Sequence, residues 1–96
     1  MNKQETRDKI NSITRWVAYR VYSKAGEKGK FVKAYDKLNA KVLIDHDINI
    51  SDITASSENK ANNVFDVLGE KELQMVLESA QSLQKMYNEA LEYSYV

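Results

Sequence analysis

The last quarter of the chain carries the clearest pattern of apolar and polar positions. Between Glu70 and Tyr93, apolar residues return at alternating intervals of three and four, and two further leucines widen the row: Leu73, Val76, Leu77, Ala80, Leu83, Tyr87, Ala90 and Leu91. At about 100° per residue this row covers one side of an α-helix, and polar residues fill the other side. The pattern predicts a long amphipathic helix, with Leu77 and Leu83 in the core.

The first half of the chain predicts two more helices. The first, over residues 3–24 and stopped by Gly26, is indicated by four aliphatic residues in one narrow sector of a helical wheel: Ile10, Ile13, Val17 and Val21. After a turn at residues 25–30, apolar residues resume helical spacing and predict a second helix to about residue 43: Phe31, Ala34, Tyr35, Leu38 and Val42.

The segment between these helices and the last one is harder to assign. Residues 45–57 are dense in Asp, Asn, Ser and Thr, which favour turns and helix caps, so we expect a loop. Ser57 then precedes a predicted short helix over residues 58–68, and Gly69 separates that helix from the last one. The chain is therefore predicted to form a single domain, residues 1–96, that is all-α: a small helical bundle of about four helices.

An α+β fold is the alternative. Residues 16–22 and 31–35 are rich in aromatic and β-branched residues and flank a glycine-containing turn, which is also typical of a β-hairpin. Val42, Ile44, Ile48 and Ile50 lie at every second position, as in a strand, with His46 interrupting the apolar series. The alternative is thus an N-terminal helix, a small antiparallel meander and C-terminal helices. We favour the all-α fold, and the last helix is the same in both.

Composition narrows the classes of function. The chain has no cysteine, which excludes disulfides, thiolate zinc sites and cysteine nucleophiles. The first nine residues are polar and charged, which argues against a secretory signal, and no apolar run is long enough to span a bilayer. We therefore expect a cytoplasmic protein that does not act in a membrane.

The net charge of zero hides a division along the sequence. Residues 1–44 hold 11 Lys and Arg against 4 Asp and Glu, a net +7, and residues 45–96 hold 3 against 10, a net −7. Such asymmetry is a hint of an electrostatic partner. The other interpretation, to which we give somewhat more weight, is that the two halves face each other or alternate around the surface.

One loop resembles the start of a calcium-binding EF-hand. Asp45, Asp47 and Asn49 alternate as that loop requires, but its sixth position needs glycine and holds Ile50, and its twelfth needs glutamate and holds Ser56. We expect an ordinary acidic loop. His46, the single histidine, lies between the two aspartates and is expected to be a surface residue, although it could serve as a pH sensor.

Nothing in the sequence indicates catalysis. Gly26 and Gly29 lack the spacing and the following Lys-Ser/Thr of a phosphate-binding loop, and no serine lies in a nucleophile-elbow motif. We expect a non-enzymatic protein without cofactor or metal.

Surplus aromatic and basic residues suggest where a partner binds. The helix over residues 3–24 carries a second, non-aliphatic face rich in Tyr, Trp and Arg, the residue types enriched at binding hot spots, and the next helix adds a lysine row. The candidate partner-binding residues are Arg15, Trp16, Tyr19, Arg20, Tyr22, Lys30, Lys33 and Lys37. A line of adaptable methionines and a tyrosine on the last helix, Met75, Met86 and Tyr93, is the candidate for self-association. Both faces could instead complete the core, an equally weighted alternative.

These observations favour a small interaction protein that binds and inhibits or regulates another protein, as a homo-dimer or higher oligomer. One alternative is a nucleic-acid-binding module that uses the basic first half. Another is an oligomer that sequesters a nucleotide or other small ligand. The Lys- and Asn-rich composition without cysteine or proline is similar in general character to that of phage and mobile-element accessory proteins, a similarity that assigns a role to no residue.

Overall fold

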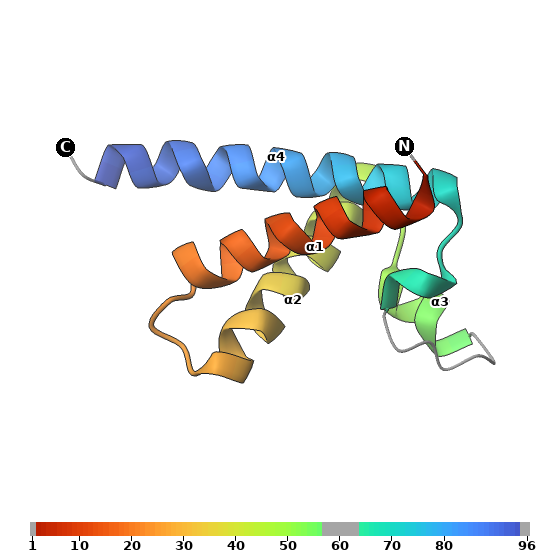
Figure 1. The fold of residues 1–96 in the computed structure, drawn as a ribbon, viewed down its shortest axis with the longest axis horizontal. Coiled ribbons are helices and arrows are strands. Elements are labelled where there is room, and N and C mark those ends of the chain that lie inside the picture. The colour runs from red at the N-terminus through yellow and green to blue at the C-terminus, as the bar shows by residue number, and fades with distance from the viewer. Residues whose placement is uncertain (1, 57–63, 95–96) are drawn as a thin grey trace.

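The computed structural model describes residues 2–56 and 64–94, which form four α-helices and one short 3-10 helix (Figure 1). Their bounds are α1 Lys3–Arg20, α2 Glu27–His46, α3 Ile50–Ser56, η1 Val64–Val67 and α4 Glu70–Ser94. No strand occurs within the described ranges. The predicted all-α bundle is confirmed, and the hairpin and meander proposed for residues 16–50 are wrong because that stretch is built mainly from α1 and α2.

Helix α1 begins where a polar side chain can satisfy its free backbone donors. The side-chain oxygen of Asn2 accepts from the backbone N–H of Glu5 at 2.8 Å, and the Asn2 amide donates back to the Glu5 carboxylate at 2.9 Å. The first bond is an N-cap, and the second joins the side chains of the cap and of the third helical residue. Together they fix the start of α1, so that Ile10 and Val17 fall on the buried side.

Helix α1 ends earlier than the sequence predicts, at Arg20 instead of about residue 24, and α2 begins earlier, at Glu27. Gly26 is not the stop of α1; it is the N-cap residue of α2, and its carbonyl accepts from the N–H of Lys30 at 3.0 Å. The six residues between the two helices form the turn. Gly26 therefore acts on the helix that follows it.

The predicted loop over residues 45–57 holds the end of one helix and the whole of another. Asp47 takes a left-handed conformation, with φ of 56°, and its N–H donates to the Leu43 carbonyl at 3.0 Å, which ends α2. Two residues later, the side chain of Asn49 accepts from the N–H groups of Ser51 and Asp52 at 3.1 and 3.3 Å. The polar residues are thus caps, and α3 follows at once.

The helix predicted for residues 58–68 is not found as such. Residues 57–63 lie outside the described residues, and the part that is described, Val64–Val67, is a 3-10 helix. Gly69 separates this element from α4, as predicted, and its carbonyl accepts from the N–H of Leu73 at 2.9 Å. The last helix has the predicted extent.

The core lies where α1, α2 and α4 pack against one another. Leu77 and Leu83 are 1% and 2% exposed, so the predicted stripe of α4 faces inward along this part of the helix. Phe65 of η1 and Ile50 of α3 complete the same cluster. In Figure 1, α3 and η1 lie together beside the end of the bundle where α4 begins.

The opposite end of the bundle is built differently. Its buried residues are small, Val17, Ala18 and Ala34, and larger, partly buried residues pack around them: Trp16, Val21, Tyr22, Phe31 and Tyr87. Helix α4 continues past the end of α1 (Figure 1). Its apolar stripe is consequently less covered there: Tyr87 is only partly buried and Ala90 is exposed.

Candidate partner-binding site

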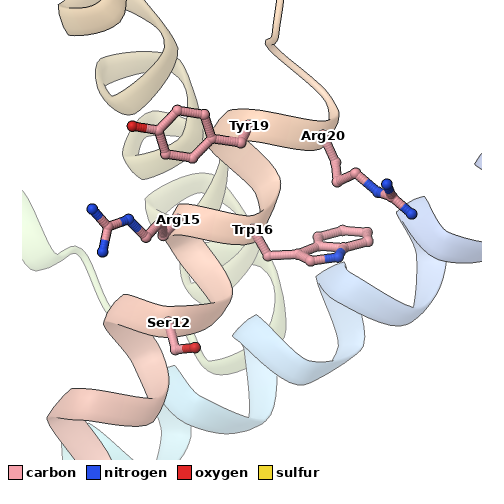
Figure 2. Close-up of a pocket in the computed structure, with 5 residues that line it drawn as sticks. All are labelled: Ser12, Arg15, Trp16, Tyr19 and Arg20. Carbon is pink, nitrogen blue, oxygen red and sulfur yellow. The ribbon is translucent and has the colours of Figure 1, made fainter.

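Trp16 occupies the boundary between α1 and α4. Its sequence neighbours Val17 and Ala18 face the core, which places Trp16 at the edge of the buried side, and its ring is partly buried. Figure 2 shows the indole directed over α4. A large aromatic side chain is thereby held between two helices while part of its surface remains open to a ligand.

A shallow hollow of about 400 Å³ lies on the α1 side of Trp16. Four of the eight residues predicted to bind a partner line it together with one serine: Ser12, Arg15, Trp16, Tyr19 and Arg20. In Figure 2 Arg15 and Tyr19 point to one side of α1, whereas Trp16 and Arg20 point to the other, toward α4. The structure therefore brings these four predicted residues together around one depression.

A second hollow of about 410 Å³ lies on the α4 side of the same indole and is lined by Trp16, Gln81, Gln84, Lys85 and Asn88. Three of these residues, Gln81, Lys85 and Asn88, belong to the polar side of the last helix, which was expected to be a solvated face. The sequence gives no sign of their role, because periodicity shows which side of α4 is polar but not which residue of another helix lies beside it. The two hollows share Trp16, and we call their combined lining the Trp16 surface.

Tyr19 is held in place by the first turns of α2. Its hydroxyl donates to the Glu27 carboxylate at 2.6 Å, its ring meets that of Phe31 edge-on at 5.4 Å, and the Lys30 ammonium lies 4.7 Å from the ring centre. The hydrogen bond raises the pKa of Tyr19 and lowers the pKa of Glu27. Tyr19 is still 42% exposed, so it forms a rigid but accessible wall of the Trp16 surface.

Tyr22 does not belong to this surface. Because α1 ends at Arg20, the chain turns before Tyr22 and directs it inward, where its hydroxyl lies 3.3 Å from that of Tyr87 on α4. Burial and the hydrogen bond to Tyr22 raise the pKa of Tyr87 to about 12. The structure thus separates Tyr22 from Tyr19, which the helical wheel had placed on one face.

The lysines of the predicted row on α2 lie in different environments. The side chain of Lys30 is only 11% exposed, because it is drawn over Tyr19 and toward Glu27 at 3.3 Å. Lys33 and Lys37 are exposed, and the described residues provide them with no ion-pair partner. Neither lysine lines the Trp16 surface. Of the three candidate lysines, the structure connects only Lys30 with the aromatic residues, through Tyr19.

The acidic segment that resembles an EF-hand is used for structure. The Asp45 carboxylate accepts from Lys41 at 2.9 Å and from the buried hydroxyl of Ser79 at 3.0 Å, which lowers its pKa. Asp47 and Asn49 cap α2 and α3. His46 lies 3.9 Å from the Glu78 carboxylate. Within the described residues, no group of three or more His, Cys, Asp or Glu is placed to hold a metal ion.

The three residues proposed for self-association lie at different depths. Met75 is partly buried, Met86 is 54% exposed, and Tyr93 lies in the last turn of α4, with its side chain outside the described part of the structure. Of the two members whose side chains the structure describes, Met86 is the more exposed.

No protein-family model, curated protein or solved structure matches this chain. Across the described ranges, no helix combines the length and apolar character needed to cross a membrane.

Proposed function

We propose that this chain is a non-enzymatic interaction protein that binds and inhibits or regulates another protein through the Trp16 surface. One observation carries the proposal: a half-buried tryptophan is seated between two helices, with hollows on both sides and with Arg15, Arg20 and Tyr19 around it. Trp, Tyr and Arg are the residues that supply most of the free energy at protein interfaces.

The fixed geometry of this surface favours binding. Trp16 is packed against the small residues of the cluster, and Tyr19 is held by a hydrogen bond, a ring contact and a cation. Ordering a flexible side chain at an interface costs about 0.5–1.5 kcal/mol. Side chains that are already ordered avoid most of that cost, so a partner would gain more net affinity here than on a loose surface.

The shape of the surface argues against the small-ligand alternative. Sites for small molecules enclose most of the surface of their ligand. Both hollows beside Trp16 are shallow and open, so a bound nucleotide would remain largely in water. A protein partner has no such difficulty, because its own surface closes the hollows.

An affinity capture from the native host lysate tests the proposal. We expect the wild-type chain to retain a protein after nuclease treatment and Trp16→Ala to lose it, while Lys9→Ala, at an exposed position two turns before Trp16, retains it. Circular dichroism would confirm that the variants are folded. Recovery of nucleic acid alone, or capture of the same protein by Trp16→Ala, would contradict the proposal.

We propose further that the chain self-associates, and that the exposed Met86 lies in the contact. Near this residue the apolar stripe of α4 extends beyond the cover of α1, and small domains commonly bury such a face in a symmetric dimer. Sedimentation should show a dimer for the wild type and a shift toward monomer for Met86→Glu. A monomer at high micromolar concentration of the wild type would disprove it.

A further inference from the structure

We infer that the segment which binds the Trp16 surface is acidic: a short stretch of a partner protein in which carboxylates surround an apolar or aromatic side chain. The inference rests on the proposed function and specifies the chemistry of the partner. Its basis is the balance of hydrogen-bond donors and acceptors around the two hollows.

The lining is rich in donors and contains no carboxylate. Arg15, Arg20 and Lys85 contribute cationic N–H groups, and the indole N–H of Trp16 has no hydrogen-bond partner among the described residues. The amide side chains of the second hollow add further donors. The carboxylate of Glu27, which contacts Tyr19 of the lining, already accepts from Tyr19 and pairs with Lys30. A ligand that satisfies these groups must supply acceptors, and preferably anionic ones.

The cations that line the Trp16 surface form no ion pair with the described residues, in contrast to Lys30 and Lys41, although Lys33 and Lys37 on the outer face of α2 are also unpaired there. Lys30 and Lys41 each pair with a carboxylate one turn away on α2, at 3.3 and 2.9 Å. For Arg15, Arg20 and Lys85 the described residues offer no such partner. Complementary charge across an interface steers association and fixes the register of the partner. These three cations are therefore available to an incoming carboxylate.

The extent of the cationic region fits a short segment better than a phosphate chain. On α4 it is flanked by exposed carboxylates: Glu78 lies one turn before Gln81, Glu89 directly follows Asn88, and Glu92 lies one turn after Asn88. Glu78 and Glu92 are fourteen positions apart, which corresponds to about 21 Å along a helix. Each strand of duplex DNA carries one negative charge about every 3.4 Å along the helix axis. A nucleic acid that followed this face would therefore bring phosphates close to those carboxylates, which repel them. A peptide can place its few carboxylates between them.

Trp16 gives a direct measurement, because it is the only tryptophan of the chain. The probe is a short synthetic peptide of glutamates around one phenylalanine, compared with the same peptide carrying glutamine in place of glutamate. We expect the acidic peptide to change Trp16 fluorescence saturably, with an affinity that falls as salt rises, and the glutamine peptide to bind about tenfold more weakly or worse.

Two double variants with equal loss of charge locate the interaction. Arg20→Gln with Lys85→Gln should weaken binding of the acidic peptide about tenfold. Lys9→Gln with Lys71→Gln removes two exposed cations from the same two helices, outside the lining of both hollows, and should leave binding unchanged. Equal binding of the two peptides, no saturable signal, or equal losses in both variants would overturn the inference, as would tighter binding of a single-stranded oligonucleotide than of the acidic peptide.

The same variants separate this inference from the proposed function. If the protein captured from lysate is lost with Trp16→Ala but kept with the double variant Arg20→Gln and Lys85→Gln, the surface binds a partner, but the inference that the bound segment is acidic is wrong. If Trp16→Ala keeps the captured protein, the proposed function itself fails.

Discussion

The two ends of this bundle are made from the same helices but are packed in different ways. At one end, Leu73, Val76 and Leu77 of α4 are buried beneath α1 and α2, and Ile50 of α3 and Phe65 of η1 belong to the same cluster. At the other end, the fully buried residues are small, and aromatic residues lie around them half exposed. No described segment plays the part of α3 and η1 there.

If the proposed function is correct, this difference separates the residues that stabilise the domain from those that bind its partner. An aliphatic cluster that is closed on all sides stabilises the fold, since each buried side chain removes apolar area from water. Half-exposed aromatic residues stabilise the fold less but retain surface for a partner. Under the proposed function, the end with α3 stabilises the fold and the end with Trp16 binds the partner.

The largest expected effect is at the closed end. Replacing Leu77 or Leu83 by alanine should lower the free energy of unfolding by about 2–5 kcal/mol, because each change leaves a cavity in a fully packed region. That is a large share of the total for a domain of this size. Chemical denaturation gives the value directly. An unchanged midpoint for both variants would show that this end is not the stable one.

Trp16→Ala should have a smaller effect on stability even though it removes more atoms. Since the ring is only partly buried, we expect the free energy of unfolding to fall by about 1–2 kcal/mol. Replacing a fully buried tryptophan by alanine typically costs roughly 3–5 kcal/mol. The same denaturation experiment measures it. A loss larger than that of Leu77→Ala would remove the distinction between the two ends.

Asn49→Ala tests how α3 is attached to the closed end. The change removes the acceptor for the N–H groups of Ser51 and Asp52 and should cost about 1 kcal/mol. Asn49→Ser keeps an acceptor and is the matched control. If the alanine variant is as stable as the serine variant, the cap does not hold α3.

The sequence predicted the long helices because their apolar rows are regular. The stripe of α4 and the row from Ile10 to Val21 both placed the core residues on the buried side. Helix α3 was missed for a physical reason: the polar side chains that favour loops are the same ones that cap helices, and composition alone does not distinguish a loop from two successive caps. Asp47 and Asn49 are the two caps.

The site could be predicted only on one of its two helices. Arg15, Trp16, Tyr19 and Arg20 could be grouped from the sequence because they lie within the helical part of α1, where a helical wheel is valid. Tyr22 was misplaced because it follows the last helical residue, so its direction depends on the turn. Gln84 and Lys85 were missed because their role depends on which helix packs beside α4, and a single sequence does not contain that information.

The pair of tyrosines at the aromatic end should make stability depend on alkaline pH. The pKa of Tyr87 is raised to about 12 in the fold, above the value of about 10 for an unfolded tyrosine. The fold therefore favours the protonated form, and its contribution is complete below pH of about 10 and is lost as pH rises through about 12. Tyr87→Phe, measured by denaturation at several pH values, should flatten this decline. A decline of the same steepness in the variant would show that other groups cause it.

The smallest effect on stability is expected for Lys33→Ala combined with Lys37→Ala, and this makes the pair a sharp test of where binding occurs. Both lysines are exposed and have no ion-pair partner among the described residues, so their loss should change the unfolding free energy by no more than about 0.5 kcal/mol. If the aromatic end carries the partner, capture of that partner should be harmed more by Trp16→Ala or Tyr19→Ala than by the double lysine variant, since the lysines lie outside both hollows.

If instead the basic half binds nucleic acid, the two lysines would neutralise phosphates, and their loss would weaken oligonucleotide binding and reduce its salt dependence by about 0.9 in log–log slope per contact on duplex DNA. Submicromolar, salt-sensitive binding of an oligonucleotide that is abolished by the lysine changes would move the functional surface from the aromatic end to the outer face of α2. The net −7 charge of residues 45–96 opposes that outcome, because a polyanion close to so small a domain is repelled by those carboxylates as well as attracted by the lysines.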